Sequence, residues 1–471
     1  MGTSTKKNMS SGSGSSSYFL PIPEGHWLRR YSPPAPDPGA ETPLEKTLAD
    51  LRFRARKVLE RGLPSVRSEA FRYTNLQFLL SEEFTPDRRQ VTREEIEEEL
   101  FRDLPVKEGE HRLVFVNGRF LSELSTGFVS ESGLEILRIG GGHGTEARRE
   151  EEGSKIAEYI GRTTLADFSS IAAWNTAHLH DGVAVFVQRG KKISEPIRIR
   201  HFIRGEGNRK IVSFPRLLVV AEEGAEVFVA ETYAGDSGRT LTIPMTELIV
   251  GRAARVEYCR VVREGGEGVH LSAQEALLEE DAVLRSHAFH FGGALARNDV
   301  RAVLNGENVE VTLNGLSLLS GTEHLDNHTV LEHRRPHGRS REIFKSVLAD
   351  HARNVFRGLI HVWKEAQKTD AVQSNRNILL SPTARVESRP QLEIYADDVK
   401  CTHGATVGRL EEEALFYCRS RGIPLESARV LLTQAFAADL VEEVAVKEYR
   451  EALAEAVRAR LERMLGREEP R

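Results

Sequence analysis

A turn-like segment recurs along the middle of this chain, and its recurrence constrains the fold more than any other feature. Segments rich in Gly, Ala and acidic residues precede β-branched runs and return roughly every 26 to 30 residues, as in a structural repeat. Each repeat would supply a corner and strands that cannot bury their apolar side alone, so stacked repeats would share one core, as in a β-helix. The segments begin at Glu223, Gly251, Glu280 and Gly306, with later echoes at Lys364 and Pro382.

The stretch between about Val183 and Gly408 consists almost entirely of short runs rich in Val, Leu and Ile. Such runs indicate a mainly β fold, and the repeat favours a parallel β-helix. The alternative is a sandwich or a cupin barrel, whose strands pair as hairpins across Asn-Gly or Asp-Gly turns. The pattern alone leaves this alternative open, because such dipeptides are present. They begin at Asn117, Asp181, Asn305 and Asn314.

The composition changes at both ends of this region, which divides the chain into four parts. Residues 1–43 are rich in Ser, Gly and Pro and predict a disordered tail with a stiff linker, or the remnant of an organelle transit peptide. Residues 44–175 predict a helical or mixed domain, residues 176–408 the β-helix core, and residues 409–471 a second helical domain. The individual helices are expected over residues 43–61, 94–101, 410–421, 424–441 and 446–465.

The helix expected over residues 424–441 has more apolar surface than a short bundle needs to bury. Leu425, Leu432 and Phe436 belong to its apolar stripe. This stripe either packs on the β core or forms a docking surface for a partner.

Charge and motifs argue against several function classes. Among the 471 residues, 65 Lys and Arg stand against 70 Asp and Glu, so there is no general positive field for nucleic acid or an anionic membrane. No apolar run approaches the roughly 18 residues of a membrane-spanning helix. No G-x-x-x-x-G-K-[ST], H-E-x-x-H or G-x-S-x-G motif occurs, so nucleotide binding, zinc peptidase and α/β-hydrolase chemistry lack their usual signature.

The three cysteines, Cys259, Cys401 and Cys418, are far apart and form no C-x-x-C pair. This spacing fits neither a secreted disulfide framework nor a self-contained zinc module. We therefore expect a reducing compartment such as the cytoplasm. Cys259 and Cys418 are expected to be packing residues.

The densest cluster of polar residues is His324-Leu-Asp326-Asn-His328, followed by His333 and His337. On one strand, alternation would point His324, Asp326 and His328 to the same face, where two imidazoles and a carboxylate can meet one metal ion. The chain would then be a metal-dependent enzyme of β-helix or cupin type. The alternative is a polar ladder on a solenoid face.

Cys401 and His403 form a smaller candidate site. Residues two apart in a strand project together, so a thiolate and an imidazole would make half of a soft-metal site. An iron–sulfur cluster ordinarily needs about four ligands, so the others would come from elsewhere in the fold or from another subunit. Alternatively, Cys401 is a small buried hydrophobe.

Three long segments closely resemble the SufB/SufD family of iron–sulfur cluster assembly proteins: residues 370–380, 390–408 and 415–424. The resemblance is stronger to the SufD branch, and it extends from about Leu44 to Val441. The segments that favour this branch are Glu69–Leu76, Asn175–Gly182 and His324–Thr329.

The resemblance implies a right-handed parallel β-helix between N-terminal and C-terminal helical domains. It also implies a non-catalytic scaffold that pairs with a SufB-like subunit through the β-helix and docks a SufC-like ATPase with its C-terminal helical domain. ATP would be hydrolysed by that partner, and this chain would bind no nucleotide. Nucleic acid and membrane are not expected as partners. The protein would act in the cytoplasm, or in the plastid stroma of a photosynthetic eukaryote.

The same resemblance assigns site residues. Cys401 and, more importantly, His403 match positions that would share a transient iron–sulfur cluster with the partner at the subunit interface. Leu425, Leu432 and Phe436 would contact the ATPase. No ligand role transfers to the cluster between His324 and His337.

Overall fold

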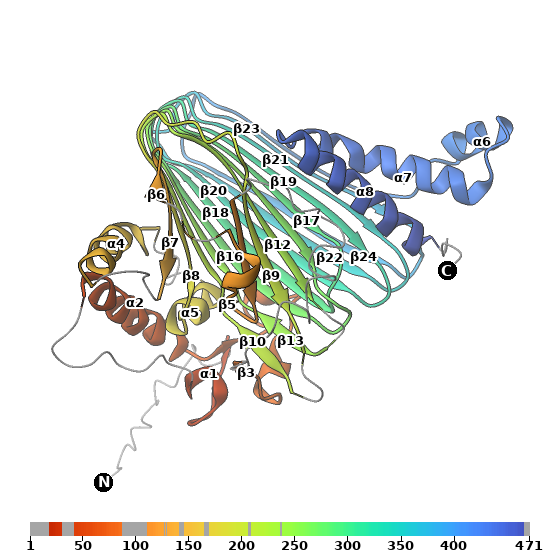
Figure 1. Ribbon diagram of the computed structural model, residues 1–471. Helices are drawn as coiled ribbons and strands as arrows, with labels where there is room; N and C mark the ends of the chain where they lie inside the picture. Colours follow the sequence, from red (N-terminus) through yellow and green to blue (C-terminus); the bar gives the residue numbers. More distant parts are fainter. Residues whose placement is uncertain are drawn as a thin grey trace, which may run out of the picture.

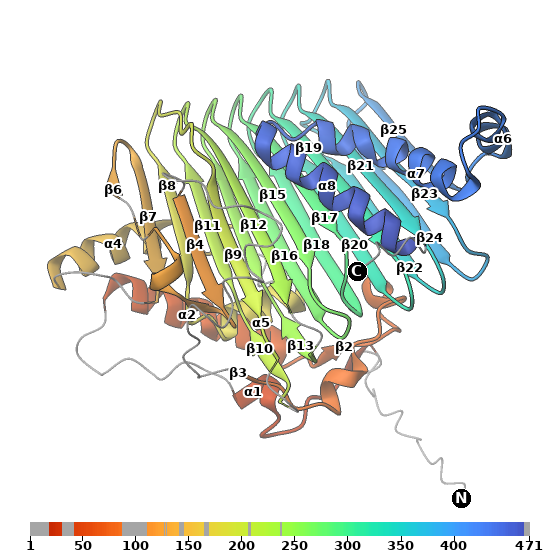
Figure 2. The ribbon, with the colours of Figure 1, turned by 45° about the vertical axis from the view of Figure 1, so that its right-hand side comes forward.

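The chain forms a parallel β-solenoid with helices at both ends (Figure 1). This computed structural model describes residues 18–30, 42–86, 111–126, 128, 130–140, 146–163, 169–205, 209–235 and 238–465. Two long sheets face each other, and consecutive long strands alternate between them (Figure 2). The expectation of a mainly β, parallel solenoid is thus confirmed.

Sheet I runs in the order β24-β22-β20-β18-β16-β14-β11-β8-β7-β6, and it is parallel from β24 to β8. Its strands are β6 (Ser130–Glu131), β7 (Leu134–Ile139), β8 (Gly182–Val187), β11 (Arg216–Ala221), β14 (Met245–Val250), β16 (Val269–Leu278), β18 (Leu295–Leu304), β20 (His324–His333), β22 (Arg353–Val362) and β24 (Arg385–Ile394). The short strands β3 (Thr85–Pro86), β10 (Ile211–Ser213) and β13 (Thr240–Thr242) belong to the same sheet as a side branch, in which β13 pairs with β16.

Sheet II runs in the order β25-β23-β21-β19-β17-β15-β12-β9-β4-β5, and it is parallel from β25 to β4. Its strands are β4 (His111–Val116), β5 (Arg119–Phe120), β9 (Ile197–Ile203), β12 (Glu226–Gly235), β15 (Arg255–Arg263), β17 (Val283–His290), β19 (Glu310–Leu319), β21 (Arg339–Leu348), β23 (Asp370–Leu379) and β25 (Lys400–Gly408).

The recurring segments of the sequence are the corners of the solenoid. Five of the six connect a strand of sheet I to the next strand of sheet II, and the one at Pro382 lies at the opposite edge, between β23 and β24. At the first edge, one residue of each corner has a positive φ, and its N–H donates to a carbonyl of the next corner. Gly, Asn and Asp tolerate this left-handed conformation best and fill three of the six positions, whereas Ala, His and Lys fill the other three. The corner residues are Gly224, Ala253, Asp281, Asn308, His337 and Lys368.

The space between the sheets is apolar along most of the solenoid. Inward-pointing Val, Leu and Ile residues of successive strands stack on one another, because parallel pairing in register places like positions together. Val219, Leu248, Ala276 and Ala302 exemplify one such stack on sheet I.

Among the described residues, only one of the Asn-Gly dipeptides, at Asn117, forms the hairpin turn that the alternative architecture requires. Asn117 and Gly118 both have positive φ and connect β4 to β5 in an antiparallel hairpin. The Asn-Gly at Asn305 lies in a corner, and Asn314 lies inside β19. The sandwich or barrel architecture is therefore wrong.

The sequence predicted a disordered tail over residues 1–43, but part of this segment is folded. Within the described residues 18–30, β1 (Phe19–Leu20) pairs with β2 (Leu63–Pro64). Trp27 of α1 (Trp27–Arg30) is buried, and its Nε1 donates to the Leu79 carbonyl at 3.2 Å. Burial of this large side chain holds the segment against the N-terminal helical part.

Helix α2 (Pro43–Leu59) begins where it was expected. Thr42 caps it, and a capping box with Glu45 satisfies the first backbone donors. The further elements of this part are η1 (Glu69–Phe71), η2 (Gln77–Leu80), η3 (Ser122–Leu124), α4 (Glu146–Tyr159) and α5 (Ser170–Ala177). The helix expected over residues 94–101 lies outside the described residues. Both sheets begin before residue 176, because β4 and β7 already pair with β9 and β8.

Three helices follow the last strand, close to their expected bounds: α6 (Glu412–Ser420), α7 (Leu425–Glu442) and α8 (Lys447–Met464). Helix α8 and the C-terminal half of α7 lie across the outer face of sheet II (Figure 2). Helix α6 and the start of α7 project beyond it.

Candidate functional site

The solenoid has an open end at its last coil. Among the described residues, β24 pairs only with β22 and β25 only with β23, so each is an edge strand of its sheet. Most residues of β25 are exposed, in contrast to the buried strands behind them. The interior of the last coil therefore faces the surroundings.

Cys401 and His403 lie on this last coil and share one strand face, as the sequence predicted. Cys401 pairs in register with Ala371, which belongs to the buried core, and the half-buried Cys401 packs against that core. His403 pairs in register with the buried Gln373 and is itself exposed. Both residues therefore lie on the face of β25 that continues the interior of the solenoid. Cys401 continues the apolar core there, and His403 continues a polar row.

The environment of Cys401 keeps its thiol protonated in the free chain. Burial raises the pKa of Cys401, the negative charge of Asp370 raises it further, and a hydrogen bond with the backbone of Ala371 opposes them. A thiol binds iron as the thiolate, so a metal would have to displace this proton. The raised pKa of Cys401 therefore disfavours its thiolate in the free chain.

The interior behind His403 is polar. On β21, Glu342 accepts a hydrogen bond at 2.6 Å from Nε2 of Gln373 on β23. Burial raises the pKa of Glu342 to about 7, and the Thr329 hydroxyl and the Gln373 amide only partly oppose this rise. Further side-chain hydrogen bonds in the same coils involve Ser346, Asn354, Asn375 and Asn377.

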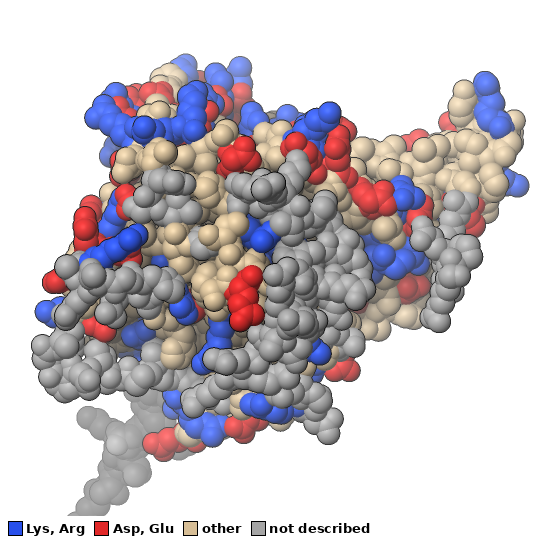
Figure 3. All heavy atoms as spheres, in the orientation of Figure 1, with Lys and Arg blue, Asp and Glu red and all other residues tan. Residues whose placement is uncertain are grey.

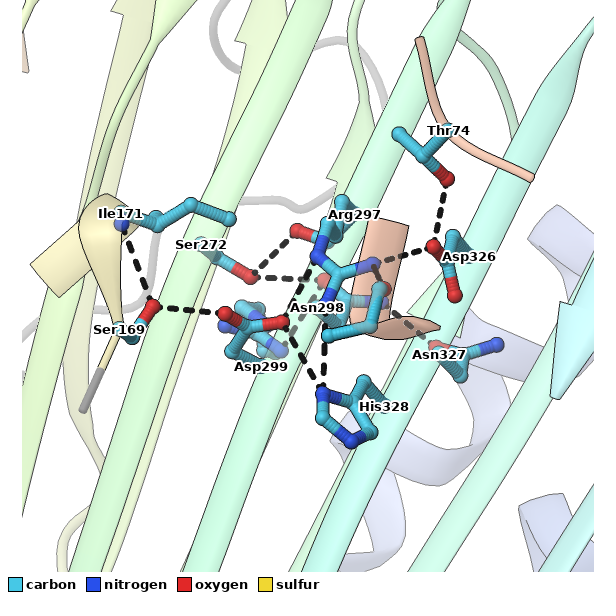
Figure 4. A network of polar contacts seen from close by, with 12 residues as sticks. Thr74, Ser169, Ile171, Ser272, Arg297, Asn298, Asp299, Asp326, Asn327 and His328 are labelled. Carbon is cyan, nitrogen blue, oxygen red and sulfur yellow. Dashed lines mark hydrogen bonds and ion pairs between the residues drawn. The ribbon is translucent and has the colours of Figure 1, made fainter. Parts of the chain in front are cut away.

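The second candidate cluster, on β20, is occupied by protein contacts. Asp326 accepts hydrogen bonds from Arg297 of β18 and, at 2.5 Å, from the Thr74 hydroxyl (Figure 4). Nδ1 of His328 accepts from Arg297 Nη2 at 3.2 Å, because a guanidinium only donates. Asp299 forms an ion pair with Arg297 at 2.8 Å, and the guanidinium holds the pKa of Asp299 at about 2 against the effect of burial.

The remaining histidines of this cluster serve separate parts of the solenoid. His324 is largely buried, and burial lowers its pKa. His333 is buried, and its Nε2 lies 2.9 Å from the Ser340 hydroxyl. His337 is a corner residue whose N–H donates to the Gln367 carbonyl. The alternative interpretation as a polar ladder therefore describes this cluster better than a metal centre does.

No group of three or more His, Cys, Asp and Glu side chains is arranged to hold a metal ion within the part of the chain that the structure describes. Cys401 and His403 thus remain two candidate ligands that cannot complete a site by themselves. The sequence analysis missed Arg297, Glu342 and Gln373, although Gln373 lies inside one of the segments that carried the resemblance.

The projecting arm formed by α6 and the start of α7 carries exposed apolar side chains. On the face seen in Figure 3 the arm is mostly uncharged, with Lys or Arg atoms at its tip. Leu425 is exposed, whereas Leu432 is half-buried between α6 and α7, and Phe436 packs near sheet II beneath Lys345. The largest exposed apolar residues of the arm are Phe416, Tyr417, Leu425 and Leu431.

None of the helices in the described residues is long and apolar enough to cross a membrane.

Two family descriptions match the chain. The SufBD protein N-terminal region matches residues 41–199, and the SufBD core domain of the SUF system for FeS cluster assembly matches residues 202–436. Together they cover the N-terminal helical part, the solenoid and the start of the C-terminal helices.

Curated proteins of the same kind are similar over most of their length. Iron-sulfur cluster assembly protein SufD of Escherichia coli (strain K12) is 33% identical over 82% of this chain and 86% of its own length. The chloroplastic protein ABCI7 of Arabidopsis thaliana is 30% identical over 88% of this chain and 85% of its own. The SufBD family protein slr0076 of Synechocystis is 30% identical over 84% and 87%.

Proposed function

Because this chain belongs to the SufBD family of iron–sulfur cluster assembly proteins, we propose that it is a non-catalytic scaffold subunit that holds one side of a nascent cluster. The observation that carries this proposal is the placement of His403 and Cys401 at the open end of the solenoid. The cluster is cargo here, built and passed on, and it is not a resident cofactor.

A SufB-like subunit completes the site. The edge strands β24 and β25 offer backbone groups to another chain, and a second parallel solenoid placed end to end would extend both sheets. Such pairing would cover the exposed last coil and bring further ligands to His403 and Cys401. The ligand count requires this, since two side chains cannot hold a cluster that needs about four.

His403 and Cys401 have different tasks in this scheme. The imidazole of His403 binds iron through one ring nitrogen, or accepts a proton from incoming sulfur. Cys401 adds a thiolate only after losing its proton, which its raised pKa disfavours in the free chain.

A SufC-like ATPase docks on the projecting arm. Exposed Phe416, Tyr417, Leu425 and Leu431 give this arm an apolar surface that nothing else in the described chain covers. Leu432 and Phe436 belong to the docking unit as well, since they hold α7 in place under that surface. ATP is hydrolysed by the partner and not by this chain.

The protein acts in the cytoplasm or, where the source is a photosynthetic eukaryote, in the plastid stroma. The chloroplastic location in the name of one similar protein supports the second setting.

Co-expression with a SufB-like and a SufC-like protein tests this function. We expect a stable complex that gains iron and acid-labile sulfide on anaerobic reconstitution, while the chain alone gains neither. A stoichiometric cluster on the isolated chain, or failure to bind both partners, would contradict the proposal. Turnover of a substrate by the isolated chain with added divalent metal would favour an enzyme instead.

A further inference from the structure

A column of three side chains leads from the interior of the solenoid to the candidate ligand His403. Glu342 on β21 pairs in register with Gln373 on β23, and Gln373 pairs in register with His403 on β25. Neighbouring strands lie about 4.8 Å apart, so the Glu342 backbone lies roughly 10 Å behind that of His403. All three positions belong to the interior face of sheet II.

The hydrogen bond between Glu342 and Gln373 fixes the direction of the Gln373 amide. Nε2 of Gln373 donates to a carboxyl oxygen of Glu342 at 2.6 Å. One oxygen of Glu342 can accept this bond whether the carboxyl is ionised or protonated. The amide nitrogen of Gln373 therefore points toward β21, and its amide oxygen is free to accept a hydrogen bond from another group.

That amide oxygen has no hydrogen-bond partner within the described chain, although Gln373 is only 1% exposed. A buried acceptor without a donor costs about 1–3 kcal/mol, so the position favours a donor on the open side of the column. His403 is the neighbouring residue of the column on that side, and its ring carries an N–H.

Gly358 on β22 gives Gln373 the room that this arrangement needs. A Cβ added at Gly358 would lie 2.2 Å from Gln373 Nε2 and 2.9 Å from its Cδ. Any larger residue would displace the amide that donates to Glu342. The Gln373 side chain is thus held from two sides, by a hydrogen bond from one sheet and by close contact with the other.

We propose that Glu342 and Gln373 are positioning residues that orient the imidazole of His403 for the cluster. This inference rests on the function proposed above. The free chain contains no bond between the two residues; when the SufB-like partner covers the last coil, the exposed ring of His403 turns one N–H toward the Gln373 amide oxygen, which leaves the other nitrogen unprotonated and aimed at the iron. Outer partners of this kind commonly change metal affinity or activity about 10–100-fold when removed.

The test compares Glu342→Leu with Glu342→Gln in the complex with the SufB-like and SufC-like partners. Glu342→Leu removes the acceptor and should slow cluster formation at least about 10-fold, whereas Glu342→Gln keeps an acceptor oxygen and should stay within about 3-fold of wild type. Asn375→Leu is the matched control, because it removes another buried amide of β23 outside the column. Equal losses in Glu342→Leu and Asn375→Leu would overturn the proposal.

A second measurement reads the ring of His403 directly. The ¹⁵N shifts of its imidazole in the complex with the SufB-like partner but without cluster, assigned by their absence in His403→Ala, should report one dominant tautomer. Glu342→Leu and Gly358→Ala should give mixed tautomers. Unchanged shifts in both variants would refute the column. If His403→Ala forms clusters normally, the proposed function fails. If His403→Ala loses cluster formation while Glu342→Leu and Gly358→Ala keep it, the proposed function stands and only the role of Glu342 and Gln373 is rejected.

Discussion

Arg297 on β18 and Asp326 on β20 form an ion pair that is buried beneath the N-terminal segment (Figure 4). The same guanidinium donates to the Ala70 carbonyl at 2.8 Å and lies over the Phe71 ring at 4.0 Å. Arg297 thus joins two neighbouring coils to η1. Asp326 and His328 of β20 are both partners of this arginine, which is why they do not form a metal centre.

Arg297→Leu is expected to destabilise the protein by about 3–5 kcal/mol, because it leaves the carboxylates of Asp299 and Asp326 buried without their counter-charge. Chemical denaturation would measure the loss. Arg339→Ala is the control, since its ion pair with Glu310 is exposed and should contribute less than about 1 kcal/mol. If Asp326 bound a metal ion, added divalent cations would raise the melting temperature of the wild-type protein but not that of Asp326→Ala.

Much of the fold could be predicted because its repeat is visible in the corners. Gly, Ala and acidic residues gather in the corners between the β-branched strands, and left-handed residues such as Asp281 and Asn308 lie among them. The placement of Trp27 could not be predicted, because its burial depends on Leu79, which is distant in the chain. The entry of β4 into sheet II depends in the same way on its pairing with β9.

In the candidate site as well, relationships within one strand could be predicted, whereas contacts between strands could not. Cys401 and His403 are two residues apart on one strand, so alternation alone puts them on one face. The contact of Asp326 with Arg297 requires knowing which strands pair, and so does the column from Glu342 to His403. For Phe436, helical spacing identified an apolar stripe but not that this part of it packs near sheet II.

Stability should peak near pH 6.5. Burial lowers the pKa of four histidines to about 3–4, so the unfolded chain binds protons that the folded chain does not, and stability falls as the pH drops from about 6.5 to 4. Burial raises the pKa of Glu275 to about 8 and that of Glu342 to about 7, so their contributions are lost as the pH rises through those values. The histidines are His178, His287, His290 and His333.

Melting temperatures between pH 4 and 9 would check this profile. Glu342→Gln should flatten the alkaline side, because it removes one of the two carboxyls that favour the protonated form, and it should leave the acid side falling. A melting temperature that rises steadily through pH 8 would show that these buried groups do not set the profile.

Replacing exposed apolar residues of the arm should weaken ATPase docking without unfolding the chain. Phe416 is 73% exposed and Leu425 42% exposed, so Phe416→Asp and Leu425→Asp should change stability by less than about 0.5 kcal/mol. Burying the new carboxylates in an interface costs several kcal/mol, so the dissociation constant should rise at least about 10-fold.

Leu432→Asp and Phe436→Asp are to be compared with the variants of the exposed residues Phe416 and Leu425. Both side chains are half-buried within the chain, so their replacement should lower the melting temperature as well as weaken docking. Calorimetric titration with a SufC-like protein separates the two effects. Wild-type affinity in a folded Phe416→Asp, Leu425→Asp double variant would place the ATPase elsewhere.

His403→Ala should abolish cluster assembly in the complex while the fold and the binding of both partners persist. His403 is exposed on an edge strand, so its loss opens no core cavity and should scarcely change the melting temperature. Alanine can neither bind iron nor accept a proton, whereas Cys401→Ser keeps a weak oxygen donor and should have a milder effect. The measurements are thermal unfolding, complex formation and cluster transfer for both variants. If His403 were a structural residue, His403→Ala would instead melt earlier or lose the SufB-like partner, and wild-type cluster transfer by this variant would refute the assignment.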